Sequence, residues 1–368
     1  MILIILDGLG DTGKKTPLSE AKKPHLDALA QKGETGFFWS VAKGVVPGSD
    51  TAHMSMFGYL DDYPGRGVLE ALGIGITPKS NAVYFRGNVA HVEGTAVKDR
   101  RAGRPSTAQT TEAIREISGM EFYGITFNVY AAGGHRVVVE ALGEGVHPIP
   151  DLDTHKEGRI HLPEGKDKMA MAVRRFLTEV HKRLGERQIN WILLRGASVY
   201  KPVPTVTERY HIRMGAVTGG SLYTGVARYL GMETFKIGTG DASTPLEKKF
   251  KKAQQLSKYY DAVFLHVKAT DIFGHDGDFE GKKKFIEKVD AHIPILDGPL
   301  AITGDHSTPV ALKRHSSHPV PLLITESGRS DKGGFDEKHA LKGGLRLVGK
   351  ELFLYLLDIA GHPQMVGT

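Results

Sequence analysis

The chain has 368 residues, about 40% of them hydrophobic and 24% charged, which is the composition of an ordinary globular protein and excludes a disordered one. It contains no cysteine, which excludes a disulfide scaffold and a thiolate-bound zinc site. The net charge of +6 is mild and suits an anionic substrate, and no apolar stretch approaches the roughly 18 residues of a membrane helix. We therefore expect a cytoplasmic enzyme with a small-molecule substrate and with neither a nucleic-acid nor a membrane partner. The sequence does not indicate an oligomeric state.

The first expected element is a strand at residues 1–6 (MILIIL), which ends at Asp7. Unbroken apolar runs of this kind are typical of strands buried on both faces of a parallel sheet. The residues that follow, GLGDTGKK at 8–15, nearly form the phosphate-binding loop of an NTPase. That loop needs Ser or Thr directly after its lysine to hold Mg²⁺, but Lys15 occupies the position and Pro17 follows soon after. The sequence therefore disfavours an NTPase.

A serine stands at the start of the next notable element. Gly48 is expected to form a sharp turn before a helix over residues 50–58. Ser49 then lies at the helix N-terminus, where the dipole and the free N–H groups favour an anion. A serine alkoxide held there by a metal is suited to accept a phosphoryl group. An ordinary N-cap serine is the alternative, and the spacing alone favours it.

The middle of the chain has a different pattern. Shorter alternating runs at 82–92, 126–131 and 136–142 predict antiparallel strands, and the apolar spacing from Met169 to Leu184 predicts a helix. We therefore expect an α+β domain over residues 81–207, inserted into an α/β core formed by residues 1–80 and 208–368. The basic tracts at 247–252 and 282–284 are typical of solvated helix faces.

Two later apolar runs, residues 262–267 (AVFLHV) and 299–303 (PLAIT), are followed by Asp271 and Asp305. Ligand sites of parallel sheets lie beyond the carboxyl ends of the strands, so we expect both aspartates to join Asp7 at one edge of one sheet. Because the three runs are far apart in the sequence, this sheet must be assembled from both ends of the chain.

Histidines accompany these aspartates. His275 follows Asp271 by four residues, His306 directly follows Asp305, and His315 lies a little further on. Carboxylates and imidazoles without cysteine suit Mn²⁺, Mg²⁺, Zn²⁺ or Co²⁺. Together with the aspartate after the first strand, these groups exceed the needs of one ion, so two nearby ions that assist phosphoryl transfer are expected. Each residue alone could also be an ordinary turn aspartate or surface histidine.

Five motifs stand in a specific order: LDGLGD at 6–11, GSDTAHMSMFGY at 48–59, KATDIFGHDGDFE at 268–280, GDHSTP at 304–309 and HSSHPVPLLI at 315–324. Weaker ones are RGNVAHV at 86–92, DRRAGR at 99–104 and DTHKEGR at 153–159. Over nearly its whole length the chain thereby resembles the archaeal-type 2,3-bisphosphoglycerate-independent phosphoglycerate mutases of the alkaline phosphatase superfamily. The resemblance implies an alkaline-phosphatase-like core, with a mostly parallel sheet and helices on both faces, and a smaller inserted lid domain.

The resemblance also implies two divalent ions, with manganese favoured and magnesium, cobalt or zinc as alternatives. Its pattern assigns Asp7, Ser49, Asp305 and His306 to one ion, and Asp271, His275 and His315 to the other. Ser49 is then the nucleophile, although Gly48 and Asp50 replace the Asn and Glu of the Gly-Asn-Ser-Glu motif found in the bacterial branch. His53 matches a histidine of that motif and is expected to support the serine or to contact the substrate.

The implied reaction interconverts 3-phosphoglycerate and 2-phosphoglycerate, a step of glycolysis and gluconeogenesis, without a bisphosphoglycerate cofactor. Ser49 takes the phosphoryl group, glycerate reorients and takes it back through its other hydroxyl, and the lid excludes water. Asp153 is expected to assist proton transfer and Arg100 to act beside it. The candidates for binding the substrate carboxylate are Arg100, Arg101, Arg104, Lys156 and Arg195, which could equally be surface cations.

Three further kinds of function stay open. A metal-dependent phosphatase, or a mutase for another small phosphate or phosphonate acid, would share the metal ligands and differ in the lid. A nucleotide-binding module would need a true phosphate-binding loop, and a structural or nucleic-acid-binding role would leave the Asp and His pairs at the strand ends unexplained.

Overall fold

The computed structural model describes residues 1–153 and 158–365 and divides the chain into two compact units. The core unit contains Met1–Tyr63 and Val203–Thr368, and the inserted unit contains Pro64–Pro202. The inserted unit begins earlier than residue 81, because helix α4 (Arg66–Gly73) packs against strands β3 (Ala82–Glu93) and β9 (Trp191–Val199) of that unit. Among the described residues, no helix combines the length and the apolar character needed to cross a membrane.

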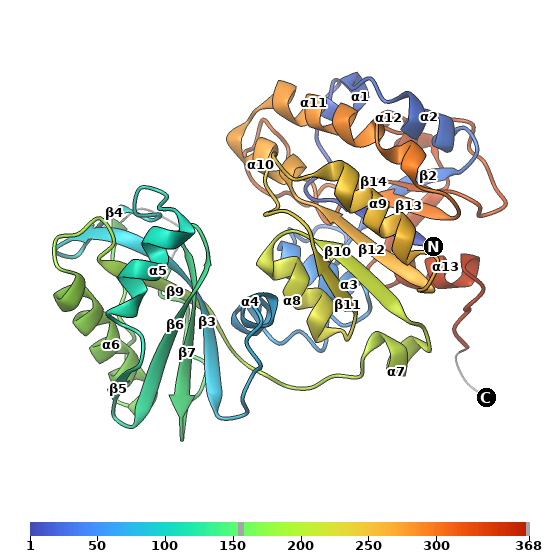
Figure 1. Cartoon of the computed structure of the whole chain (residues 1–368). Helices are drawn as coiled ribbons and strands as arrows, with labels where there is room; N and C mark the ends of the chain where they lie inside the picture. The colour runs from blue at the N-terminus through green and yellow to red at the C-terminus, as the bar shows by residue number, and fades with distance from the viewer. Residues whose placement is uncertain (154–157, 366–368) are drawn as a thin grey trace. The chain divides into compact units, whose positions relative to one another are not determined.

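The core unit is built on an eight-stranded sheet with the order β11-β10-β12-β1-β13-β14-β2-β15 (Figure 1). The sheet is mostly parallel, as predicted, and β14 runs antiparallel to both of its neighbours. The strands are β1 (Ile2–Leu6), β2 (Glu34–Trp39), β10 (Met214–Thr218), β11 (Glu233–Lys236), β12 (Ala262–Val267), β13 (Leu300–Thr303), β14 (Val320–Ile324) and β15 (Leu345–Val348).

Strand β1 lies between two strands from the other end of the chain. Ile2 pairs with Val263 of β12 and with Leu300 of β13, and both pairings are parallel. At the end of β1 the N–H of Asp7 donates to the carbonyl oxygen of Val267 at 2.9 Å. The carboxyl ends of the three strands therefore meet at one edge, and the sheet is assembled from both ends of the chain.

Helices cover both faces of this sheet, because alternate residues of each buried strand point to opposite sides. Val263 of β12 belongs to a buried cluster with Phe250 of α9. Its neighbour Phe264 packs on the other face, with its ring 5.4 Å from that of Phe57, which in turn lies 5.3 Å from the ring of Phe353 in α13. The helices of the core unit are α1 (Pro17–Glu20), α2 (Pro24–Ala30), α3 (Ser49–Met56), α7 (Val206–Tyr210), α8 (Ser221–Tyr229), α9 (Leu246–Leu256), α10 (Ala269–Asp276), α11 (Phe279–Asp290), α12 (Glu337–Lys342) and α13 (Glu351–Ile359), with a 3₁₀ turn at Ile293–Ile295.

The two basic tracts are not wholly solvated. Lys249 of α9 and Lys282 of α11 are both fully buried. Lys249 lies four residues before the buried Ala253, and Lys282 lies three residues before the buried Phe285, so each lysine is on the buried face of its helix. The expectation of solvated helix faces is therefore wrong for these two lysines.

The inserted unit is a seven-stranded sheet with the order β5-β6-β7-β3-β4-β8, and β9 pairs with β3. Its pairings are antiparallel, as the alternating runs predicted. Besides β3 and β9, the strands are β4 (Ala96–Asp99), β5 (Met120–Phe122), β6 (Ile125–Gly133), β7 (Arg136–Gly143) and β8 (Gly158–Arg159), and besides α4 the helices are α5 (Thr107–Arg115) and α6 (Lys168–Leu184).

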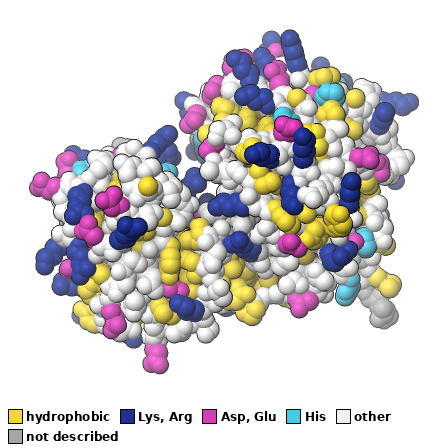
Figure 2. All heavy atoms as spheres, viewed as in Figure 1, with side chains coloured by type: hydrophobic (Ala, Val, Ile, Leu, Met, Phe, Trp, Pro, Cys, Tyr) yellow, Lys and Arg dark blue, Asp and Glu magenta, His cyan; other side chains and the backbone are white. Residues whose placement is uncertain are grey.

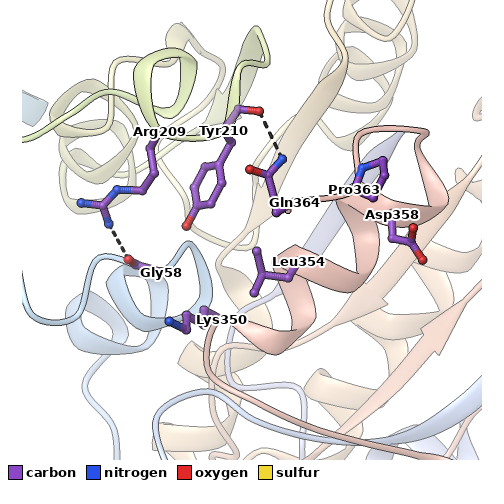
Figure 3. Close-up of a pocket in the computed structure, with 8 residues that line it drawn as sticks. All are labelled: Gly58, Arg209, Tyr210, Lys350, Leu354, Asp358, Pro363 and Gln364. Carbon is purple, nitrogen blue, oxygen red and sulfur yellow. Dashed lines mark hydrogen bonds between the residues drawn. The ribbon is translucent and has the colours of Figure 1, made fainter. Parts of the chain in front are cut away.

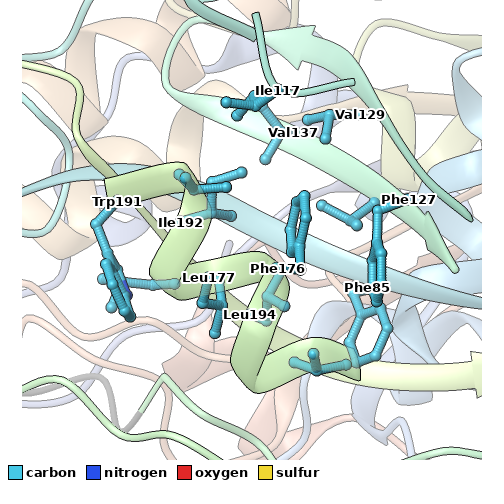
Figure 4. Close-up of a cluster of buried hydrophobic side chains, with 14 of the residues drawn as sticks. Phe85, Ile117, Phe127, Val129, Val137, Phe176, Leu177, Trp191, Ile192 and Leu194 are labelled. Atoms are coloured by element: carbon cyan, nitrogen blue, oxygen red, sulfur yellow. The ribbon is translucent and has the colours of Figure 1, made fainter. Parts of the chain in front are cut away.

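The inserted unit has a hydrophobic core of its own (Figure 4). Phe176 of α6 stacks on Phe127 of β6, with ring centroids 4.4 Å apart and planes inclined by 8°. On the other face of the sheet, Tyr84 of β3 joins Val68 of α4 in a second buried cluster. The unit therefore has a hydrophobic core of its own on each face of its sheet, which is the requirement for a domain that folds independently.

Candidate metal centre

The loops at the carboxyl edge of the core sheet bring the predicted ligands together. Asp7 directly follows β1, and Asp305 lies just after β13. Asp271 and His275 lie one turn apart on α10, so their side chains share a face of that helix. Two groups of side chains have ligand atoms within 4.8 Å of one another: Asp271 with His275 and His315, and Asp7 with Asp271 and His306. The two groups adjoin at Asp271.

The first group matches the expected set. The Nε2 atoms of His275 and His315 lie 3.4 and 3.5 Å from Oδ1 of Asp271. The Nδ1–H of His315 donates to the carbonyl oxygen of Pro47 at 2.9 Å, and that of His275 donates to the carbonyl oxygen of Lys313 at 3.1 Å. These bonds fix both imidazoles with Nε2 free to act as a metal ligand.

The side chains expected to hold the other ion, Asp7, Ser49 and Asp305, surround one imidazole nitrogen of His306. Nε2 of His306 lies 3.1 Å from Oγ of Ser49, 3.3 Å from Oδ2 of Asp305 and 3.5 Å from Oδ1 of Asp7. Asp305 accepts the N–H groups of Gly8 and His306 at its other oxygen, Oδ1, both at 3.0 Å. Ser49 is the first residue of α3, where the sequence predicted it, and it is nearly buried.

His53 lies one turn after Ser49 on α3. Its Nδ1–H donates to the carbonyl oxygen of Ser49 at 2.6 Å. Its ring contacts the rings of Tyr223, Phe264 and His266, and the side chain is fully buried. This position favours support of Ser49 over contact with a substrate.

Three polar residues of the cluster were not predicted. Nζ of Lys268 donates to Oδ1 of Asp7 at 3.1 Å and to Oδ2 of Asp271 at 2.5 Å, so it joins the two groups. The hydroxyl of Tyr223 donates to Oδ2 of Asp7, and Nε2 of His266 lies 3.1 Å from the same oxygen. His266 gave a signal in the sequence, because it is a polar residue inside the apolar run AVFLHV.

Burial and neighbouring charges set the protonation of the cluster. Burial would raise the pKa of Asp7, but the ammonium of Lys268 holds it well below its usual value. Burial, reinforced by the charge of Asp7, raises the pKa of Asp305 well above its usual value. Burial lowers the pKa of His306 to about 3, so this imidazole is neutral at physiological pH. Neutral imidazole is the form that binds metal ions.

The inserted unit holds the other predicted residues. Arg100 donates a hydrogen bond to the carboxylate of Asp153, and the N–H of Asp153 donates to the carbonyl oxygen of Leu194 at 3.0 Å. Arg195, the next residue of β9, is paired with Arg86 of β3. The structure thus brings Arg100 and Asp153 together beside the strand that carries Arg195.

Three further candidates for binding the substrate carboxylate take different positions. Arg101 and Arg104 are exposed and lie in the turn after β4. Lys156 lies outside the described residues. Arg86 was not predicted, although it opens the motif RGNVAHV; it is buried, and its Nε lies 3.5 Å from Oε1 of Glu70.

The core unit also has a cavity of about 470 Å³ that is separate from the cluster (Figure 3). Arg209 and Tyr210 of α7 and Leu354 of α13 contribute to its lining. None of the predicted site residues that the structure describes lines it.

The chain matches a known family over nearly its whole length. The family model described as "Metalloenzyme superfamily" matches residues 1–357. The 2,3-bisphosphoglycerate-independent phosphoglycerate mutase 1 of Archaeoglobus fulgidus is 39% identical over 100% of both chains. The chain belongs to this phosphoglycerate mutase family.

Two solved structures agree with that membership. The PH0037 protein from Pyrococcus horikoshii is 32% identical, with a TM-score of 0.85 over 100% of this chain and 98% of the other. The cofactor-independent phosphoglycerate mutase from Thermoplasma acidophilum is 28% identical, with a TM-score of 0.66 over 98% and 99% of the two chains. The predicted resemblance to the archaeal-type mutases is thereby confirmed.

The residues of this mutase-family chain fit divalent metal ions. Oδ2 of Asp305 is buried and has no hydrogen-bond partner among the described residues, which is unfavourable for a carboxyl oxygen unless a cation is bound. That atom and Oδ1 of Asp7 lie 3.3 and 3.5 Å from His306 Nε2, which is the spacing expected of atoms that bind one ion together. A set of carboxylate and imidazole ligands without thiolate suits the ions predicted from the sequence and does not select among them.

Proposed function

We propose that this chain interconverts 3-phosphoglycerate and 2-phosphoglycerate through a phosphoserine on Ser49, with two divalent metal ions and no bisphosphoglycerate cofactor. The observation that carries the proposal is the position of Ser49. Ser49 is the first residue of helix α3, and a helix N-terminus stabilises anions. Its Oγ lies 3.1 Å from Nε2 of His306 within the Asp and His cluster.

The residues of the cluster divide between the two ions. Asp271, His275 and His315 would hold one, and Asp7, Ser49, Asp305 and His306 would hold the other. Bound ions of this kind neutralise charge on the phosphoryl oxygens and favour the alkoxide form of the serine. Lys268 adds a further positive charge beside both ligand groups.

The covalent step is an exchange of one P–O bond for another. Oγ of Ser49 bonds to phosphorus as the bond from phosphorus to the substrate oxygen breaks, and the serine proton passes to the departing oxygen. Asp153 is suited to carry that proton, because Arg100 and its backbone bond to Leu194 fix its position. Glycerate then attacks phosphoserine through its other hydroxyl, and the proton moves in the reverse direction.

The inserted unit is proposed to act as the lid that retains glycerate. Its cations Arg100, Arg101, Arg104 and Arg195, with Lys156, are suited to bind the carboxylate of the substrate. Retention of glycerate separates a mutase from a phosphatase, because water that reaches phosphoserine would release inorganic phosphate. Basic and acidic side chains are interspersed on the face drawn in Figure 2, which fits a small anionic substrate better than a nucleic acid.

The test is an assay of 3-phosphoglycerate to 2-phosphoglycerate conversion with added Mn²⁺, no 2,3-bisphosphoglycerate, and free phosphate recorded in parallel. Isomerisation with little phosphate release is the expected result. Phosphate release without isomerisation would instead assign the chain to a metal-dependent phosphatase. No reaction with either phosphoglycerate would direct the search to other small phosphate or phosphonate acids.

A further inference from the structure

One hydroxyl group lies between the two ligand groups. Thr308 is fully buried, and its Oγ1–H donates to Oδ1 of Asp271 at 2.7 Å. Nδ1 of His306 lies 3.1 Å from the same Oγ1. A hydroxyl has one proton, so Nδ1–H of His306 must donate to Thr308, which leaves Nε2 of His306 as the ligand atom. Thr308 therefore orients one ligand from each group.

Lys282 of α11 holds the backbone of this threonine. Its side chain is fully buried, and Nζ donates to the carbonyl oxygens of Thr308 at 3.0 Å and Gly10 at 3.2 Å, and to Oδ2 of Asp11 at 3.0 Å. The three acceptors use the three protons of the ammonium. None of these contacts involves a metal ligand directly.

The acceptors come from the two loops that carry ligands. Gly10 and Asp11 follow Asp7, and Thr308 follows Asp305. The loops also bond to each other, since the N–H of Thr308 donates to the carbonyl oxygen of Gly10 at 3.1 Å. Isolated β-bridges pair Ser307 with Leu9 and with Gly10, so the two backbones are in close contact. Lys282 thus sits where the two loops are joined.

We propose that Lys282 and Thr308 form an internal clamp that fixes the two ligand groups relative to each other, and that both are positioning residues for the metal centre. The inference rests on the metal-dependent function proposed above. Partners of this outer kind, which hold the ligands and do not touch the ion, typically change metal affinity about 10- to 100-fold when they are removed.

A buried lysine could also serve stability alone, and Lys249 provides the matched control. It is equally buried and lies on a helix of the same unit. The described residues give its ammonium neither a hydrogen bond nor an ion pair. Lys249→Met therefore removes a buried ammonium without touching the ligand loops.

The experiment is calorimetric titration of Mn²⁺ into the metal-stripped full chain, for the wild type, Lys282→Met and Lys249→Met, each shown to be folded by circular dichroism. We expect Lys282→Met to bind Mn²⁺ about 10- to 100-fold more weakly and Lys249→Met to bind as the wild type does. Wild-type affinity in Lys282→Met would overturn the clamp. A purely structural lysine would lower the melting temperature and leave the affinity of the folded protein unchanged.

If Lys282→Met does not fold, a second pair of variants decides. Thr308→Val keeps the volume and removes the hydroxyl, whereas Thr308→Ser keeps the hydroxyl. The clamp predicts weakened Mn²⁺ binding in the valine variant and nearly wild-type binding in the serine variant, and equal binding in both would overturn it. The titration needs no substrate. If the mutase assay fails but the variants still differ in Mn²⁺ affinity as predicted, the proposed reaction is overturned and the clamp is not.

Discussion

Two lysines of the core unit are fully buried, and their surroundings differ. Lys282 has three oxygen acceptors around its ammonium, so its charge is compensated. Burial lowers the pKa of Lys249 to about 7, and the described residues provide no partner that would raise it. The charge of Lys249 contributes to lowering the pKa of His266 on β12, which is itself buried. A buried lysine therefore joins two loops through hydrogen bonds at position 282, whereas at position 249 its charged form is unfavourable.

The first prediction concerns Lys249→Met, which should stabilise the protein more at pH 6 than at pH 9. The pKa is about 7 in the folded state and near 10.5 in the unfolded state. Between these values the unfolded chain binds a proton that the folded chain does not, so wild-type stability rises with pH. The advantage of the methionine variant should therefore shrink by about 1.4 kcal/mol per pH unit from pH 7 to 10. Urea unfolding across this range measures it, and a pH-independent difference between the two proteins would contradict it.

The second prediction concerns Ser49→Ala, which should lower isomerisation by at least about 1,000-fold, because the nucleophile is lost. Stability should fall by only about 1 kcal/mol, for the hydrogen bond to His306. Ser55→Ala is the control, since Ser55 is a buried serine on the same helix and outside the ligand groups. Ordinary turnover in the Ser49 variant would remove Ser49 from the mechanism.

At the scale of elements, the strand ends were predictable and the side-chain contacts were not. Apolar runs ending in aspartate placed Asp7, Asp271 and Asp305 at one sheet edge, because strands buried on both faces leave a clear signal. The helix beginning near Ser49 was also predictable, from the glycine that precedes it. Which atoms of these residues meet depends on loop geometry, and no spacing rule encodes it.

Lysines were the main omission, for a physical reason. A lysine in a charged run is usually solvated, so Lys249 and Lys282 were expected on solvated helix faces, and Lys268 was not singled out at all. The helical spacing could have indicated that the lysines in the two tracts are buried. Phe285 and Ile286, for example, follow Lys282 by three and four residues, so all three lie on the stripe that faces the sheet. Lys268 gave no comparable signal, since its role depends on carboxylates brought from distant strands.

The third prediction concerns the ligand group shared by α10 and the loop before β14. His315→Ala should lower the bound Mn²⁺ by about one ion per chain, because His315 belongs to one ligand group only. His292→Ala should leave the metal content unchanged, since His292 lies outside both groups. Metal analysis after dialysis gives the ratio, and two ions retained in the His315 variant would refute the division of the ligands.

At the scale of the whole molecule, the chain consists of two units with separate cores. All residues of the candidate metal centre lie in the core unit. The inserted unit is one continuous segment, Pro64–Pro202, with packed clusters on both faces of its sheet. Such a segment is expected to fold alone.

The fourth prediction follows from this division. In calorimetry, Mn²⁺ should raise the unfolding temperature of the core unit and leave that of the inserted unit unchanged. A free concentration of 100 times Kd stabilises the binding unit by about 2.7 kcal/mol. The isolated segment 64–202 identifies its own transition and serves as the metal-insensitive control. A single transition that shifts as a whole would show that the two units unfold together.

The place of β1 between β12 and β13 has a consequence for synthesis on the ribosome. Its apolar residues ILIIL emerge long before either neighbour, since Ile2 pairs with Val263 and Leu300. At roughly 5–20 residues per second, this strand stays without partners for more than about ten seconds, while the inserted unit can already be complete. During that interval the exposed apolar strand must be kept from aggregating with other nascent chains. The proposed metal ions cannot bind before the last third of the polypeptide is synthesised, because it carries most of the expected ligands.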